Sequence, residues 1–82
     1  MKLQKWNYRI KDYVDYEIPN DWNVLIYSNS MDTECNCASC GKLIRVGNSY
    51  TSQEIHTKHG WGYLICQICM AKETERRNKE WN

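Results

Sequence analysis

Four cysteines in two closely spaced pairs are the residues of this sequence best suited to chemistry. Each pair, Cys37/Cys40 and Cys66/Cys69, has two residues between its cysteines, and 25 residues separate Cys40 from Cys66. Thiolates at this spacing surround one tetrahedral Zn²⁺ ion, because a tight turn aims both sulfurs of a pair at one point. The sequence therefore predicts one zinc ion held by four thiolates. Since no position is left for water or substrate, we expect the zinc to be structural.

One further cysteine and two histidines could compete for a place at this site. Cys35 could replace Cys37, but the Cys-x-x-Cys-Gly run that starts at Cys37 is typical of a metal knuckle. Its glycine permits a positive φ, which lets backbone N–H groups point at the sulfurs. We therefore expect Cys35 to be a free thiol near the metal. His56 and His59 could be further ligands or a catalytic pair, and the simpler interpretation is two partly exposed histidines on a hairpin.

Length and composition narrow the class of protein. A chain of 82 residues is expected to form a single domain. Its core would supply only about 3–5 kcal/mol of stability, so a bound structural metal would be a suitable additional source of stability. The net charge of +1 argues against binding nucleic acid through bulk charge alone. Four Trp and six Tyr suit interfaces as well as a core. No secretory leader or membrane span is evident, so we expect a cytoplasmic protein with reduced, metal-binding cysteines.

The first part of the chain, residues 1–34, predicts antiparallel strands, because apolar and polar residues alternate with a period of two. We expect residues 6–10 and 14–18 to form a hairpin around a three-residue loop, which would set Tyr8 opposite Tyr16. One long strand bent near the middle of this loop is the alternative. Residues 22–27 are predicted as a third strand, followed by a polar connector.

The second part, residues 35–82, predicts a knuckle, a hairpin and a helix. After the first cysteine pair, short strands alternate with Gly-containing turns. The chain after Cys69 has a helix-forming composition without Gly or Pro, and Glu73/Arg77 and Glu75/Lys79 are favourable i,i+4 pairs. We therefore expect the second cysteine pair at a helix N-terminus, where the helix dipole stabilises thiolates. The expected fold is α+β: a small antiparallel β-meander, then the zinc unit with its C-terminal helix.

Residues 35–80 resemble the treble-clef zinc fingers. The resemblance rests on the Cys37-x-x-Cys40-Gly41 knuckle, the hairpin, and the second Cys-x-x-Cys that opens a helix. As a whole, the chain also resembles small phage-encoded zinc-binding proteins. That second resemblance implies a regulator or inhibitor of a host machine.

The function we expect is binding without catalysis, with a protein partner preferred because charge is balanced and aromatic residues are abundant. The alternative is a DNA- or RNA-binding finger, with phosphate contacts from Lys72, Arg76 and Lys79 on one helix face. Trp61 and Trp81 are further candidates for an interface. No small-molecule substrate is evident.

A degenerate nuclease is the least favoured alternative. Treble-clef HNH nucleases carry a general-base histidine between the two cysteine pairs and commonly a second histidine after them. His56 lies between the pairs, but Met70 follows the second pair, and no Asp-His or Asn partner is evident. A metal-dependent nuclease also needs a second, open metal site.

Overall fold

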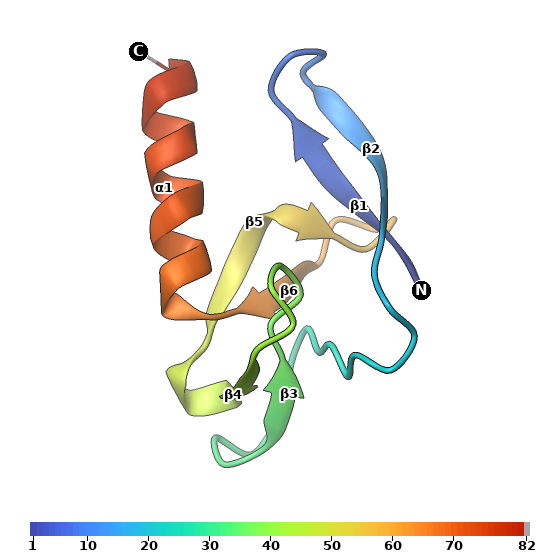
Figure 1. Cartoon of the computed structure of the whole chain (residues 1–82), viewed down its shortest axis with the longest axis vertical. Helices are drawn as coiled ribbons and strands as arrows, with labels where there is room; N and C mark the ends of the chain where they lie inside the picture. Colours follow the sequence, from blue (N-terminus) through green and yellow to red (C-terminus); the bar gives the residue numbers. More distant parts are fainter. Residues whose placement is uncertain (82) are drawn as a thin grey trace.

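The computed structural model describes the backbone of residues 1–81 and the side chains of residues 1–79. Its fold is α+β, as predicted, and consists of an antiparallel sheet, a small second sheet and one C-terminal helix (Figure 1). The large sheet has the strand order β2-β1-β5-β6 and the small sheet pairs β3 with β4. The elements are β1 (Lys2–Asn7), β2 (Asp12–Glu17), β3 (Glu34–Asn36), β4 (Leu43–Arg45), the 3₁₀ turn η1 (Val46–Asn48), β5 (Tyr50–His56), β6 (Gly62–Ile65) and α1 (Gln67–Trp81).

Strand β1 joins the two parts of the chain, because it pairs with β2 on one edge and with β5 on the other. Lys5 lies opposite both Val14 and Ile55. The N-terminal hairpin is thus an extension of the sheet that the second hairpin begins. The position of the metal-binding half therefore depends on strands that lie far from it in the sequence.

The predicted register of the first hairpin is wrong. Leu3 pairs with Tyr16 and Trp6 with Tyr13, around a turn at residues 8–11 in which Lys11 has a positive φ of 53°. Tyr8 and Tyr16 are therefore not partners. The physical reason is burial: Leu3 is 3% exposed and Ile10 is 60% exposed, so the strand begins nearer the N-terminus than the alternation of residues 6–10 indicates.

The predicted third strand at residues 22–27 is also wrong, so there is no three-stranded N-terminal meander in the described residues. The segment is irregular because its backbone bonds are divided between two other segments. The carbonyl of Asn23 accepts from the Asn36 N–H at 2.8 Å, and that of Leu25 accepts from the Leu64 N–H at 2.8 Å. A residue pattern typical of a strand is used here to bridge the knuckle and β6.

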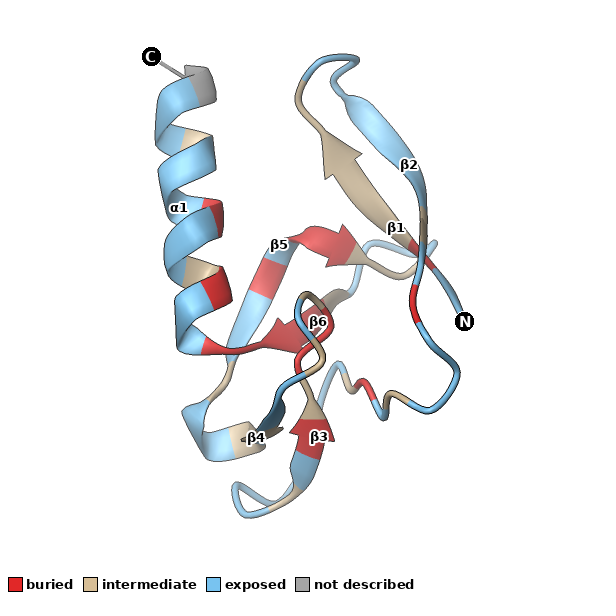
Figure 2. Cartoon of the chain, viewed as in Figure 1, coloured by how far each residue is buried: buried red, intermediate tan, exposed pale blue. Residues whose placement is uncertain are grey.

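The core lies where the sheet, the knuckle and the start of α1 meet (Figure 2). Helix α1 packs on β5. Among the described side chains of the helix, Cys69 and Glu73 are buried and lie one turn apart, and Figure 2 shows the buried positions of α1 on the side toward the sheet. Cysteines form part of the same apolar cluster as residues from the first hairpin. The buried cluster contains Leu3, Ile18, Val24, Cys37, Ala38, Ile55, Tyr63, Ile65, Cys66 and Cys69.

Candidate metal centre

The turn of the β3–β4 hairpin carries the first cysteine pair. The Cys37 N–H donates to the Lys42 carbonyl, and the Gly41 N–H donates to the Cys37 carbonyl, both at 2.8 Å. The N–H groups of Ser39 and Cys40 point at the Cys37 sulfur, each at 3.4 Å. Gly41 has φ +80°, a conformation that favours glycine, so the chain closes the knuckle as its sequence predicts.

The second pair lies where β6 runs into α1. Cys66 directly precedes the helix and Cys69 is in its first turn, so both sulfurs are at the positive end of the helix dipole. The Cys66 N–H donates to the Cys37 sulfur at 3.3 Å, and the Ala38 N–H donates to the Leu64 carbonyl at 3.1 Å. These bonds fasten the knuckle to β6.

All four cysteine sulfurs lie within 4.8 Å of one another, and the Cys40 and Cys66 sulfurs are 3.8 Å apart. Tetrahedral Zn²⁺ with Zn–S bonds of ~2.3 Å would place its sulfurs about 3.8 Å apart. The donor set and its spacing therefore fit one metal ion of the thiolate-binding kind. Cys37, Cys66 and Cys69 are buried and Cys40 is exposed, which leaves one edge of the site open to incoming metal.

The acidities of the sulfurs differ because of burial and their mutual hydrogen bonds. Burial, together with hydrogen bonds to Cys66 and Cys37, raises the pKa of Cys69 to about 12. Burial also raises the pKa of Cys40. Burial opposes ionisation of Cys66 too, but hydrogen bonds from the Cys69 N–H and from neighbouring thiols lower its pKa to about 7. Four thiolates so close together require a cation, so metal binding would displace protons.

The competing ligands lie outside the cluster. Cys35 is a buried thiol in β3 opposite Ile44, and burial raises its pKa. The His56 Nδ1 lies 2.9 Å from the Tyr13 hydroxyl, on the sheet, and His59 is exposed in the β5–β6 turn. Among the residues whose side chains are described, only Cys37, Cys40, Cys66 and Cys69 form a metal-binding group of this kind.

Side chains from other elements support the knuckle. The Tyr16 hydroxyl of β2 donates to the Ala38 and Ser39 carbonyls, at 3.2 and 3.3 Å. Asn36 accepts from the Asn23 N–H through Oδ1 and donates to the Gly41 carbonyl through Nδ2. The irregular segment and the first hairpin thus hold the cysteine turn from two sides. This support was not predicted, because its partners are distant in sequence.

The residues predicted to bind a partner are dispersed. Arg76 donates to the buried carboxylate of Glu54, Lys79 pairs with Glu75 at 3.7 Å on the surface, and Lys72 is exposed. Trp61 is exposed in the β5–β6 turn. The side chain of Trp81 lies outside the described residues. The binding role of all five stays a prediction.

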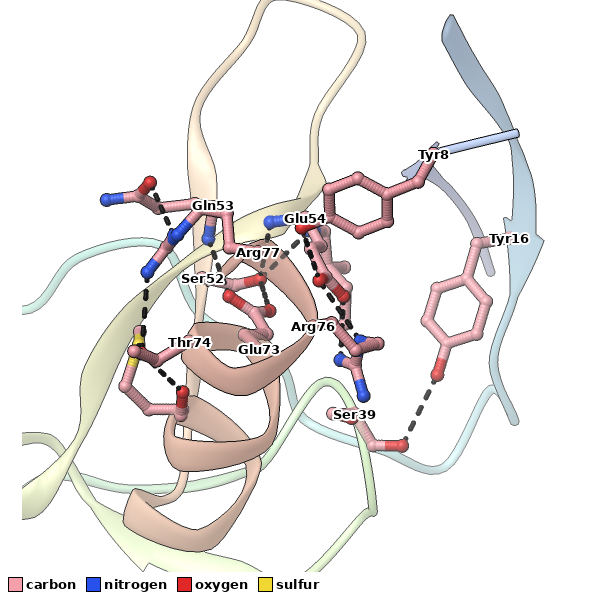
Figure 3. Close-up of polar contacts among 12 residues, drawn as sticks. Tyr8, Tyr16, Ser39, Ser52, Gln53, Glu54, Glu73, Thr74, Arg76 and Arg77 are labelled. Carbon is pink, nitrogen blue, oxygen red and sulfur yellow. Dashed lines mark hydrogen bonds and ion pairs between the residues drawn. The ribbon is translucent and has the colours of Figure 1, made fainter. Parts of the chain in front are cut away.

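Sequence reasoning missed two buried carboxylates that tie α1 to β5 (Figure 3). Glu54 accepts from the Arg76 guanidinium at 2.7 and 3.1 Å and from the Tyr8 hydroxyl at 2.9 Å. Glu73 accepts from the Ser52 hydroxyl and, at 3.0 Å, from the Gln53 N–H. The one local signal was an acidic residue within a strand-like run, and it does not indicate a partner 22 positions away.

Fold and site together define a small α+β protein with a four-cysteine cluster that could hold one metal ion. No helix in the described part of the chain is both long and apolar enough to cross a membrane. Comparisons with protein-family models, curated proteins and solved structures gave no match for the chain.

Proposed function

We propose that the chain is a non-catalytic, treble-clef-type zinc module that binds a macromolecule. The order of elements supports the treble clef: a knuckle on the β3–β4 hairpin, then the β5–β6 hairpin, then a helix that begins at the second cysteine pair. Zinc is the favoured ion because four thiolates in a tetrahedral set suit it. In this role the ion contributes to folding, and the surrounding surface does the binding.

The single observation that carries the proposal is the convergence of all four sulfurs within 4.8 Å. Four protein ligands complete a zinc coordination sphere, so a structural function follows from ligand count. The test is elemental analysis of purified protein, with one zinc per chain expected. Cys66→Ser should lose that zinc, whereas Cys35→Ser, a change at a buried cysteine outside the cluster, should keep it. Wild-type protein without bound metal would overturn the proposal.

The partner type follows less directly from this site. The protein partner favoured by composition stays a prediction, as does a phage-type role in regulating or inhibiting a host machine. Exposed Trp61, Tyr27 and Ile68 would be its candidate anchors. A nuclease is disfavoured because a metal-dependent nuclease needs a second, open metal site, and the described side chains form no metal-binding group besides the cysteine cluster. Mg²⁺-dependent nicking by wild-type protein that is absent in His56→Ala would reverse that judgement.

A further inference from the structure

Two adjoining hollows are lined by residues of the β1–β2 hairpin, β5 and α1. Figure 1 shows the hairpin and α1 on opposite sides of β5. Both hollows are lined by Trp6 and Tyr8, so they share a wall. We call them together the hairpin–helix cleft. The first is also lined by Lys5, Asn7, Arg9, Val14 and Arg76, and the second by Tyr13, Gln53 and Arg77.

The cleft is positively charged. Lys5, Arg9, Arg76 and Arg77 bring four formal positive charges, and the buried Glu54 and Glu73 behind them bring two negative ones, which leaves +2. The lining residues described include no carboxylate. The net charge of +2 at the cleft is larger than the net charge of +1 of the whole chain, so the amino-acid composition does not reveal it.

Two of these cations have no carboxylate partner among the side chains that the structure describes. Within that part of the chain, Arg77 is held by neutral acceptors only, the Gln53 Oε1 at 2.6 Å and the Thr74 hydroxyl at 3.4 Å, so its charge is positioned but not neutralised there. Arg9 is exposed in the turn of the hairpin. Arg76 differs, because its guanidinium is already paired with Glu54. Arg9 on one wall and Arg77 on the other are therefore the expected phosphate contacts.

Aromatic rings lie between these cations. Trp6 meets Tyr13 edge-on, with ring centroids 5.1 Å apart and planes at 73°, which leaves Trp6 half-buried rather than covered. Tyr8 is fixed by its hydrogen bond to Glu54 at 2.9 Å (Figure 3). Rigid, partly exposed rings beside arginine side chains are the arrangement on which unpaired bases stack.

We propose that the hairpin–helix cleft binds single-stranded nucleic acid, with bases against Trp6 and phosphates on Arg9 and Arg77. A duplex fits less well, because its bases are stacked on one another and cannot reach these rings. The proposal rests on the proposed function, since zinc would hold the start of α1 against the sheet. Its phosphate contacts, Arg9 and Arg77, also differ from Lys72, Arg76 and Lys79, the contacts predicted from the sequence for one face of the helix.

The test measures fluorescence anisotropy of labelled dT12, rU12 and a 12-base-pair duplex with zinc-loaded protein, over a series of salt concentrations. The cleft variant Arg9→Ala/Arg77→Ala is compared with Lys2→Ala/Lys58→Ala, which removes the same charge from exposed positions outside the cleft. For the bases, Trp6→Leu is compared with Tyr50→Leu, a change at an exposed ring outside the cleft. Zinc content and circular dichroism are measured on every variant first.

We expect single strands to bind more tightly than the duplex. The double variant Arg9→Ala/Arg77→Ala should make the negative slope of log affinity against log salt less steep by about 1.4. Each phosphate contact on a single strand contributes about 0.7 to that slope, and the variant loses two. Trp6→Leu should weaken binding about tenfold or more, and Tyr50→Leu should leave it unchanged. The ratio of dT12 to rU12 affinity tells whether DNA or RNA is the natural ligand.

Several results would overturn the inference while leaving the zinc module intact. One is zinc-loaded, folded protein that binds neither oligonucleotide at low salt. A second is equal loss in the two charge-matched double variants, and a third is a protein ligand that occupies the cleft instead. If Trp6→Leu fails to fold, the salt slope of the arginine pair decides. A protein without zinc, in contrast, would count against the proposed function itself.

Discussion

Glu73 is a carboxylate that the fold buries to 1% exposure, where it serves as an acceptor for β5. The Ser52 hydroxyl donates to it and in turn accepts from the N–H groups of Glu54 and Ile55, at 3.1 and 2.9 Å. These residues lie at the irregularity in the pairing of β5 with β6, where the ladder cannot satisfy every amide. One carboxylate thus organises the polar groups that the irregularity would otherwise leave without partners.

We predict that Glu73→Ala lowers the free energy of unfolding by about 2–4 kcal/mol, because it leaves the Ser52 hydroxyl and the Gln53 N–H without their acceptor. The matched control is Glu75→Ala on the same helix. Its carboxylate is exposed and, among the described side chains, pairs only with Lys79, so its loss should lower the free energy of unfolding by less than about 0.5 kcal/mol. Urea unfolding of the zinc-loaded proteins measures both. Equal effects would mean that the network does not stabilise the fold.

Tyr8 gives the protein a dependence on alkaline pH. Burial, and then its hydrogen bond to Glu54, raise its pKa from 10.0 to about 12. The folded protein therefore favours the protonated phenol, so this stabilisation is complete below pH 10.0 and is lost as pH rises through about 12. Tyr8→Phe should flatten the fall of unfolding free energy over that interval. Tyr27→Phe, at an exposed ring, should not, and a parallel fall in all three proteins would contradict the assignment.

At the scale of elements, the knuckle is the turn with the least room for change. A Cβ on Gly41 would lie 2.3 Å from the Trp22 ring, and the residue has φ +80°. Gly60, in the β5–β6 turn, has φ +89° but nothing within 4 Å of a Cβ. The two glycines therefore separate the cost of a left-handed backbone from the cost of crowding beside the metal site.

We predict that Gly60→Ala lowers the free energy of unfolding by about 1–2 kcal/mol, because a residue with a Cβ must then adopt the left-handed backbone conformation. Gly41→Ala should cost more than this and should also weaken zinc binding, because Trp22 must move or the cysteine turn must open. Competition with a chromogenic chelator measures zinc affinity, and thermal unfolding measures stability. A Gly41→Ala protein that behaves like Gly60→Ala would show that the ring yields easily.

Elements with local signals could be predicted, and those with distant partners could not. The two-residue spacing within each cysteine pair and the helix-forming run after Cys69 depend on neighbours in the chain, and the structure has both features. The register of the first hairpin depends on β5, which pairs Lys5 with Ile55. Residues 22–27 have strand-like composition, yet they bridge segments that come later in the sequence. The Tyr8–Glu54 bond spans 46 positions, and no local pattern indicates it.

At the scale of the whole molecule, the cysteine cluster and the N-terminal hairpin belong to one core. Leu3 and Ile18 share a buried cluster with Cys37, and the Tyr16 hydroxyl contacts the knuckle backbone. Zinc in such sites contributes on the order of 10 kcal/mol to folding, whereas a core of this size supplies about 3–5 kcal/mol. Loss of the ion should therefore destabilise parts of the fold that lie far from the four cysteines.

We predict that a strong chelator unfolds β1 and β2 together with the knuckle, rather than freeing the knuckle alone. Amide hydrogen exchange measures this directly: protection in residues 2–17 should fall with the same dependence on free zinc as protection in residues 34–45. Restoring zinc should restore both, and Cys35→Ser should respond like wild type, because Cys35 lies outside the cluster. Strands β1 and β2 that keep their protection after the metal is gone would show two units that merely share a sheet. In that case the hairpin wall of the cleft would survive without the ion, and only the position of α1 would depend on it.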